Sequence, residues 1–497
     1  MRLNRRDWLK LSAAGAPGLL GAAEIPSPPD ELEFPKLDFD PPSPADHRHE
    51  LPGGAVAYLV EDKQLPLVSV SLSYNMGGHL VPEELVGLAS FTGSQMRAGG
   101  TTNISARDLD EETAFLASGI STSMGALSGS AGMNCLTQNL DRTMELFFEV
   151  LKNPGFDKQR FEISRARAIQ GMERRNDDTG RISSREFRRL MRGEHFTTRS
   201  TTKASVEAVT IDGMREFHQK WIHPSRFIFA VSGDFDTQEM LDRLSEAVSA
   251  GGWPASPAEV PEIPAPPYPA PPGVFMIDKP DVNQSQIRMG HVGIERDNPD
   301  HIPLGVMNDI LGGGGFTSRI MSRVRSDEGL AYSAGSTFIP GTYYRGNFSA
   351  SFQSQNPKCA EATTIVLEEI DKMRQEKVTA EELDTSKTYA IEIFPRFFAT
   401  AGQVAGTFAS DELTGREEGY WQKYRDRVAA VTDDEVLRVA QEYLDSKKLL
   451  ILGVGNVAQM LAGNPDKPDY SFKKLDGDGE IERLRLPDPL TMEYPDA

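Results

Sequence analysis

The chain has 497 residues, which predicts two to four domains, and its 53 Lys and Arg against 73 Asp and Glu give a net charge of −20. An acidic surface repels phosphate backbones and anionic headgroups, so the composition argues against nucleic acid and membrane surfaces as partners. The two cysteines, Cys135 and Cys359, lie far apart without CxxC spacing, which excludes a disulfide framework and predicts two buried, small apolar side chains.

The N-terminus resembles a twin-arginine export signal. Residues 5–10 place two arginines ahead of a tryptophan, a leucine and a lysine, and residues 11–23 are weakly apolar. We therefore expect residues 1–23 to direct export to a bacterial periplasm, and residues 24–45, rich in proline and acid, to form an extended arm. The rest of the chain has no run of about 18 apolar residues, so the sequence predicts no membrane span.

The first strand and helices can be read from side-chain spacing. In residues 68–74 apolar side chains alternate with serines, which predicts a strand with one buried face. Helical spacing follows at residues 109–116 and 144–151, and the apolar run 227–231 predicts a buried central strand. The same types recur later in the chain, as a strand at 348–352, helices at 365–373 and 437–443, and a buried strand at 449–452.

A proline-rich segment separates two copies of one pattern. Residues 251–272 contain nine prolines and predict a semi-rigid linker. On either side the same phrases recur 222 residues apart: residues 209–212 match 431–434, where each phrase starts a helix at a Thr or Asp N-cap. We therefore predict an α+β fold with two tandem homologous domains, each a largely antiparallel sheet with helices packed on it, at residues 46–250 and 273–460, and then a polar tail at 461–497.

The first copy resembles the N-terminal half of the pitrilysin, insulinase and mitochondrial processing peptidase family, on the phrases Tyr74–Gly78, Gly87–Ala89 and Gly100–Thr101. Those peptidases carry H-x-x-E-H directly after Gly-Leu-Ala and a further glutamate about 77 residues on, and these residues bind zinc and supply the general base. In this chain the four positions are occupied by Ser90, Gly93, Ser94 and Gly171. No H-x-x-E-H occurs anywhere in the sequence, so the resemblance implies no catalytic residue and no metal in this chain.

The second copy resembles the C-terminal half of the same family, on residues 311–319 and 325–333. There an Arg and a Tyr seven residues apart point toward the zinc of the facing domain, and Arg325 and Tyr332 have that spacing. A guanidinium and a phenol can hold a peptide carbonyl and stabilise developing negative charge. The alternative is a surface salt bridge for Arg325 and a core position for Tyr332. The four glycines at 312–315 lack the Gly-Lys-Ser/Thr of a phosphate loop and predict the end of a helix at 304–311 and a turn.

The resemblance implies two domains that face each other as a clamshell, in the zinc-free subunit of a two-chain zinc metallopeptidase. We expect a heterodimer with a zinc-bearing homologue, a peptide substrate held by Arg325 and Tyr332, and an acidic lining that favours basic or unfolded segments. No cofactor is expected in this chain, since the zinc would be in the partner.

Two alternatives remain open. The first is a catalytically inactive peptide-binding or scaffolding protein that uses the same fold. The second is an autonomous hydrolase with Ser90 or Ser94 as nucleophile, although no G-x-S-x-G motif supports it.

His218 and His223 lie near the end of a predicted helix. We expect both to be surface residues, as most histidines at such positions are.

Overall fold

The computed structural model describes residues 38–254, 257–475 and 481–495. The predicted export signal and most of the predicted arm therefore lie outside the described residues. Among the described helices, none is both long and apolar enough to cross a membrane. The described parts of the predicted linker, residues 251–254 and 257–272, contain no helix or strand.

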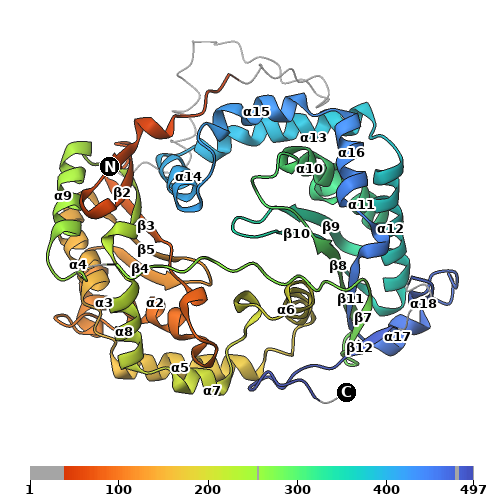
Figure 1. Ribbon diagram of the computed structural model, residues 1–497, viewed down its shortest axis with the longest axis horizontal. Helices are drawn as coiled ribbons and strands as arrows, with labels where there is room; N and C mark the ends of the chain where they lie inside the picture. The colour runs from red at the N-terminus through yellow and green to blue at the C-terminus, as the bar shows by residue number, and fades with distance from the viewer. Residues whose placement is uncertain (1–37, 255–256, 476–480, 496–497) are drawn as a thin grey trace, which may run out of the picture. The chain divides into compact units, whose positions relative to one another are not determined.

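The first half of the chain forms a six-stranded sheet in the order β1-β2-β6-β3-β5-β4 (Figure 1). Strands β2 and β6 are parallel, and the other neighbours are antiparallel. The strands are β1 (Arg48–Glu50), β2 (Val56–Glu61), β3 (Leu67–Tyr74), β4 (Gly119–Met124), β5 (Gly129–Leu136) and β6 (Ile228–Gly233). The helices are α2 (Leu88–Ala98), α3 (Ala106–Phe115), α4 (Leu140–Lys152), α5 (Lys158–Glu173), α6 (Thr179–Arg192), α7 (Lys203–Ala208), α8 (Ile211–Trp221) and α9 (Thr237–Ser249).

The second half forms a sheet with the corresponding order, β12-β7-β11-β8-β10-β9. Its strands are β7 (Gly273–Asp278), β8 (Gln284–Val292), β9 (Ala331–Ile339), β10 (Asn347–Gln355), β11 (Leu450–Gly455) and β12 (Glu482–Leu484). The helices are α10 (His301–Asn308), α11 (Arg319–Met321), α12 (Cys359–Gln375), α13 (Ala380–Ile393), α14 (Ala401–Thr414), α15 (Tyr420–Ala430), α16 (Asp433–Tyr443), α17 (Val457–Ala462) and α18 (Phe472–Leu475). The expected α+β fold with two tandem domains is confirmed.

The two sheets differ at one edge. Strand β1 precedes its neighbour in the chain and runs antiparallel to β2, whereas β12 comes from the C-terminal tail and runs parallel to β7. The tail then continues onto the first half, where the amide of Lys203 donates to the carbonyl of Leu490 over 2.8 Å. The tail therefore supplies a strand to one half and backbone contacts to the other.

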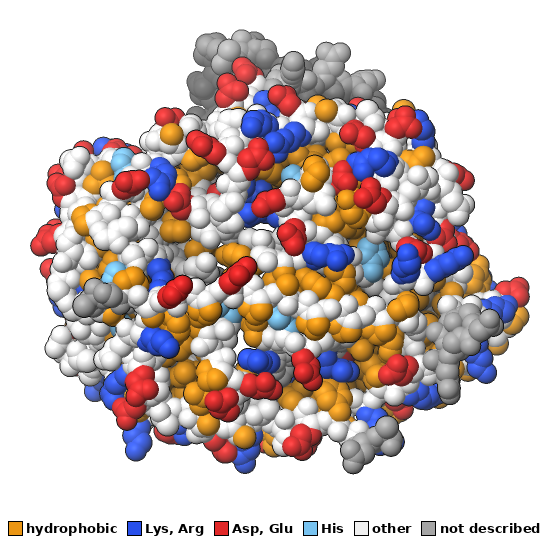
Figure 2. All heavy atoms as spheres, in the orientation of Figure 1, with side chains coloured by type: hydrophobic (Ala, Val, Ile, Leu, Met, Phe, Trp, Pro, Cys, Tyr) orange, Lys and Arg blue, Asp and Glu red, His pale blue; other side chains and the backbone are white. Residues whose placement is uncertain are grey.

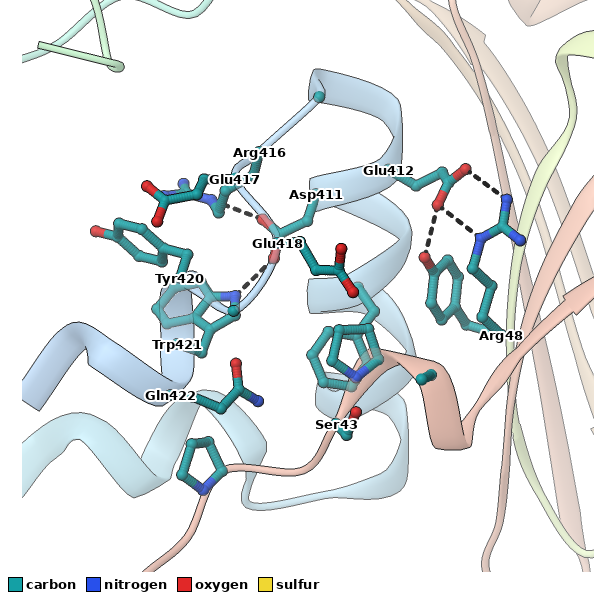
Figure 3. Close-up of a pocket in the computed structure, with 17 residues that line it drawn as sticks. Ser43, Arg48, Asp411, Glu412, Arg416, Glu417, Glu418, Tyr420, Trp421 and Gln422 are labelled. Atoms are coloured by element: carbon teal, nitrogen blue, oxygen red, sulfur yellow. Dashed lines mark hydrogen bonds and ion pairs between the residues drawn. The ribbon is translucent and has the colours of Figure 1, made fainter.

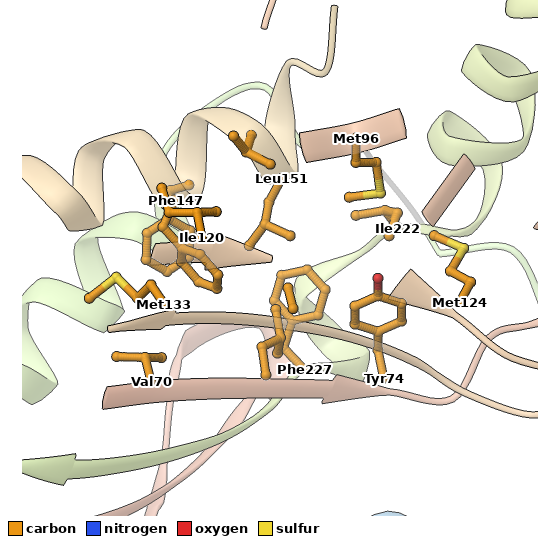
Figure 4. Close-up of a cluster of buried hydrophobic side chains, with 14 of the residues drawn as sticks. Val70, Tyr74, Met96, Ile120, Met124, Met133, Phe147, Leu151, Ile222 and Phe227 are labelled. Atoms are coloured by element: carbon orange, nitrogen blue, oxygen red, sulfur yellow. The ribbon is translucent and has the colours of Figure 1, made fainter. Parts of the chain in front are cut away.

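The core of the first half follows from the alternation predicted for residues 68–74. Val68, Val70, Leu72 and Tyr74 of β3 are buried on one face, and the serines between them point to the other. Figure 4 shows Val70 and Tyr74 beside Phe147 and Leu151 of α4 and Phe227 at the start of β6. Cys135 and Cys359 are both buried and free, as expected.

The helix starts predicted from the repeat are also confirmed. The side chain of Thr210 accepts from the amide of Gly213 at the start of α8, and that of Thr432 accepts from Glu435 at the start of α16. In both halves the strand after this helix is a central one, β6 or β11.

Each sheet is also covered by a helix from the other half of the sequence. Helix α6 packs Ile182, Phe187 and Met191 against strands β7 and β11, in a cluster that includes Ile277 and Leu452. These contacts bury apolar side chains of both halves together, which stabilises both.

Helix α14 covers β2 and β6 in the same way and adds an ion pair (Figure 3). Glu412 accepts hydrogen bonds from Nε and Nη2 of Arg48, each over 3.0 Å, and from the hydroxyl of Tyr58 over 2.7 Å. The Arg48 guanidinium holds the pKa of the Glu412 carboxyl below its usual value. Beside it, the ring of Phe408 lies 6.0 Å from that of Tyr58.

Candidate functional site

The structure brings together three of the four positions that carry zinc chemistry in the peptidase family. Ser90 and Ser94 lie four residues apart on the exposed side of α2, and Gly171 lies on α5. All three line one cavity of about 640 Å³. The correspondence drawn from the sequence phrases therefore agrees with the spatial arrangement, because residues 77 positions apart meet at the same place.

The fourth position, Gly93, points elsewhere. It is buried in the middle of α2, directly against edge strand β4, and a Cβ at this position would overlap the backbone at Ser123 and Met124. A glutamate at position 93 therefore has no room in this structure unless β4 moves. The backbone of β4 occupies the space that the Cβ of a glutamate general base at position 93 would need.

The residues at these positions do not fit a zinc ion. Hydroxyl groups and glycines are not zinc ligands at neutral pH, and the charged side chains in the cavity lining are two arginines, Arg167 and Arg175. In the described parts of the chain, no group of three or more His, Cys, Asp or Glu side chains is arranged to hold a metal. We therefore derive no chemistry from a metal bound to this chain.

Arg325 and Tyr332 lie in contact in the second half. Arg325 is in a short π-helical turn, η11 (Ser322–Asp327), and Tyr332 is the second residue of edge strand β9. The guanidinium carbon of Arg325 lies 4.7 Å from the ring centre of Tyr332. Tyr332 is 84% exposed, so the alternative of a core aromatic is wrong for this residue.

Phe316 completes this group and was not singled out from the sequence. Its ring centre lies 4.5 Å from the guanidinium carbon of Arg325, and the side chain is 67% exposed. Arg325 thus stacks on two exposed rings, an arrangement that is stabilised by cation–π attraction and limits its rotamers. The signal available in the sequence was an aromatic residue directly after four glycines.

The glycine segment itself differs from the expected turn. Helix α10 continues beyond Asn308 as a π-helical turn, η9 (Asp309–Gly313), so the helix extends past the predicted end. A Cβ at Gly312 would overlap Ser336 of β9, which is the same close approach of helix and edge strand that Gly93 permits in the first half. Gly312 is therefore needed for packing, and the single-turn η10 (Gly315–Thr317) presents Phe316.

His218 corrects one expectation from the sequence. It is buried on α8, and its Nε2 lies 2.7 Å from the carbonyl oxygen of Leu151. Burial lowers the pKa of this imidazole to about 4, so the ring is neutral at physiological pH. The residue is part of the core of the first half, and position near a helix end gave the wrong prediction.

The uncovered parts of both sheet faces carry uncharged polar side chains. In the first sheet they are Ser71, Ser73, Ser121, Ser123 and Ser130, and in the second they are Gln286, Thr337, Ser349, Ser351 and Gln353. Strands β3, β4, β5, β8, β9 and β10 contain no Asp or Glu. On these faces the expected acidic lining is wrong, because the acidic residues of the chain lie elsewhere.

Comparisons with known proteins point to one family. The family described as "Peptidase M16 inactive domain" matches residues 208–389 of this chain. An uncharacterized zinc protease of Streptomyces coelicolor is 23% identical over 320 residues, which cover 63% of this chain and 69% of that protein. The non-peptidase homolog YmxG of Helicobacter pylori is 23% identical over 347 residues, which cover 67% of this chain and 76% of that protein.

The fold gives the same result. The crystal structure of a peptidase M16 inactive domain from Pseudomonas fluorescens superposes with a TM-score of 0.73 at 22% sequence identity and covers 82% of this chain and 97% of that one. Together with the sequence relatives, this structural similarity confirms the family resemblance that the sequence motifs indicated. The chain is similar in sequence and in fold to M16 proteins, in agreement with its resemblance to the family of pitrilysin, insulinase and the mitochondrial processing peptidase.

Proposed function

We propose that this chain is a catalytically inactive M16 homologue that serves as the non-catalytic subunit of a two-chain zinc metallopeptidase in the bacterial periplasm. The matching family is described as inactive, and one relative is named a non-peptidase homolog. In the sequence itself, the family's zinc ligands and base are replaced by two serines and two glycines. The hydrolytic groups then come from a zinc-bearing homologue with an intact H-x-x-E-H.

The observation that carries the proposal is the exposed stack of Phe316, Arg325 and Tyr332. A large aromatic side chain that is 84% exposed gains no core stability for this chain. Arginine and tyrosine are enriched where proteins bind one another or a peptide, and here the two side chains hold each other in place before any ligand arrives. A ligand or partner that covers the paired Arg325 and Tyr332 would account for this exposure.

The chemistry of the stack suits a peptide carbonyl. The guanidinium of Arg325 offers several N–H donors, and the hydroxyl of Tyr332 offers one more, so the two can donate to a single carbonyl oxygen from two directions. Tyr332 also lies on edge strand β9, and edge strands can pair with an extended peptide backbone. Arg325 and Tyr332 would bind and orient the peptide while the partner's zinc site cleaves it.

A peptidase assay tests this proposal. Cleavage of a quenched, unstructured peptide is measured with this chain, with a zinc-bearing homologue from the same organism, and with the mixture, each with and without a chelator. We expect cleavage by the mixture only, lost with chelator and reduced about 10²- to 10³-fold by Arg325→Ala, which removes a donor to the developing charge. Arg396→Ala, at an exposed position of the second half, is the matched control and should change nothing. An inactive mixture would reject the proposal.

The alternative of a peptide-binding or scaffolding protein is favoured by a different observation. Both sheets end in an edge strand, β4 or β9, beside a face of uncharged polar side chains, with cross-strand hydroxyl pairs such as Ser123 with Ser130 and Thr337 with Ser349. Such a surface can hold extended peptides of many sequences by backbone pairing. An inactive mixture in which the quenched peptide still binds this chain would select this alternative.

A further inference from the structure

The cavity at the former zinc position has its own chemistry. Eleven residues line it, from α2, α5 and the turn that follows it, the segment before α7, and α7 itself. The polar ones are Ser90, Ser94, Ser164, Thr201, Arg167 and Arg175, and no Asp or Glu is among the eleven. A site that binds a metal cation in relatives is lined here by hydroxyl groups and positive charge.

Arg175 is the central observation. Its Nη2 donates to the carbonyl oxygen of Thr201 over 2.9 Å, while its Nη1 is buried without a hydrogen-bond partner among the described residues. Burial, and next the charge of Arg185, lower the pKa of Arg175, and none of the eleven residues that line the cavity is a carboxylate. A buried guanidinium nitrogen without a partner is costly, and a bound anion would remove that cost.

The hydroxyls of Ser164 and Ser90 can add donors, and that of Ser94, which donates to the carbonyl oxygen of Phe91 over 3.2 Å, can do so by turning away from it. Ser164 accepts from Nε2 of Gln95 over 2.8 Å, so its own hydroxyl hydrogen can point into the cavity. Ser90 and Ser94 are exposed on the same side of α2. Guanidinium and hydroxyl donors that converge on one cavity are the usual ligands of carboxylate and phosphate oxygens.

The surrounding chain is basic although the protein is acidic. Residues 158–203 contain 13 Lys and Arg against 6 Asp and Glu, in a chain of net charge −20. Figure 2 shows acidic and basic side chains interspersed over the face in view, so such an excess of one sign is not general to the surface. Six of these basic side chains form ion pairs, whereas Arg167 and Arg175 line the cavity itself, and their positive charge raises the local concentration of anions.

We propose that the cavity at the former zinc position is an oxyanion site, in which Arg167 and Arg175, with hydroxyls of Ser90, Ser94 and Ser164, bind a carboxylate or phosphate group. The group comes either from an acidic peptide or from a free ion. The proposal is independent of the partner chain and of Arg325, since it concerns a different half and needs no cleavage.

Titration calorimetry of the full chain, at fixed ionic strength, tests the site. The probes are inorganic phosphate, a short peptide rich in Asp and Glu, and the same peptide with Asn and Gln. We expect saturable binding of one equivalent of phosphate or of the acidic peptide, none of the neutral peptide, and a weakening of about tenfold or more in Arg175→Gln and in Arg167→Gln. Arg167 is exposed, so its variant is expected to fold.

Arg174→Gln is the matched control, because Arg174 is exposed next to Arg175 but does not line the cavity. It should leave binding unchanged. Binding of the acidic peptide that phosphate displaces would identify a peptide as the source, and binding of phosphate alone would identify a free ion. Absence of saturable binding by both probes, or an equal loss in Arg174→Gln, would overturn the proposal.

Discussion

The two halves of the chain place a cavity at corresponding positions and line it differently. Both linings contain two arginines, Arg167 and Arg175 in the first and Arg296 and Arg416 in the second, but only the second contains an acidic residue and a set of aromatic rings. Ser164 and Ser386 are separated by the repeat offset of 222 residues, and each lies on the long helix that lines its cavity, α5 or α13. The first cavity holds Arg175 and no carboxylate. The second, of about 560 Å³, holds Asp309, whose carboxyl pKa is raised by burial. Its other lining residues are largely apolar or aromatic, including Phe338, Tyr389, Phe397, Tyr420 and Tyr424.

This difference separates what a duplicated fold must keep from what it can change. Both halves keep a glycine, Gly93 or Gly312, where the first helix touches the edge strand, because any side chain there would overlap strand backbone or a packed serine. Both also keep the strand order, which needs only one buried face per strand. The residues on the cavity side of α2 and α5 are not constrained by such a contact with a strand, so their side-chain chemistry can diverge.

The largest effect expected from this comparison concerns the helix–strand contact. Gly93→Ala should lower the free energy of unfolding by about 3 kcal/mol or more, because the new Cβ overlaps the backbone of β4. Gly171→Ala is the control: the Cβ there meets nothing, and an alanine in a helix interior should raise stability by about 0.5–1 kcal/mol. Urea unfolding of both variants checks the pair. Equal stabilities would contradict the tight contact.

A smaller effect concerns the pH dependence of stability, to which the two halves should contribute differently at one pair of corresponding positions. His218 in the first half has Ala440 as its counterpart 222 residues on, and both are buried. The folded imidazole has a pKa of about 4, below the value of about 6.5 in the unfolded chain. As the pH falls below 6.5 the unfolded state binds the proton first, so stability is lost, by roughly 2–3 kcal/mol at pH 4.

The variant His218→Ala makes the first half like the second at this position. It should be less stable than the wild type at pH 7, through the cavity it leaves, but should lose less stability between pH 7 and pH 4. Chemical unfolding at several pH values measures this slope. His223→Ala, two residues beyond α8 at a part-exposed position where burial also lowers the imidazole pKa, should change the slope less than His218→Ala does. An unchanged slope in His218→Ala would show that this group is not the source.

Much of the fold could be predicted from local patterns. Alternation in residues 68–74 gave β3 with its buried face, and Thr210 and Thr432 gave two helix starts, because period and capping depend on neighbours in the sequence. The exchange of α6 and α14 between the halves could not be predicted. An apolar helix face shows that a helix is buried, but not which sheet buries it.

Some residues of the candidate site could likewise be predicted from the sequence, and others could not. Ser90, Ser94 and Gly171 could be placed at one position because a family motif fixes their spacing, and the structure brings them to one cavity. The roles of Arg175 and Phe316 could not be predicted, because they depend on burial and on contacts across the fold. The arginine-rich composition of residues 158–203 was the available signal for a basic cavity.

Zinc binding measured by equilibrium dialysis tests the central claim most directly, that the first half has lost its metal site while keeping the site's geometry. The wild-type chain is compared with the triple variant Ser90→His, Ser94→His, Gly171→Glu, which restores three ligands around the same cavity and leaves Gly93 in place. We predict no zinc bound by the wild type, one zinc bound by the variant, and no peptide cleavage by either chain alone, because neither has a base beside the zinc position. One equivalent of zinc in the wild-type chain, lost on Arg175→Gln or on Ser90→Ala, would contradict this account.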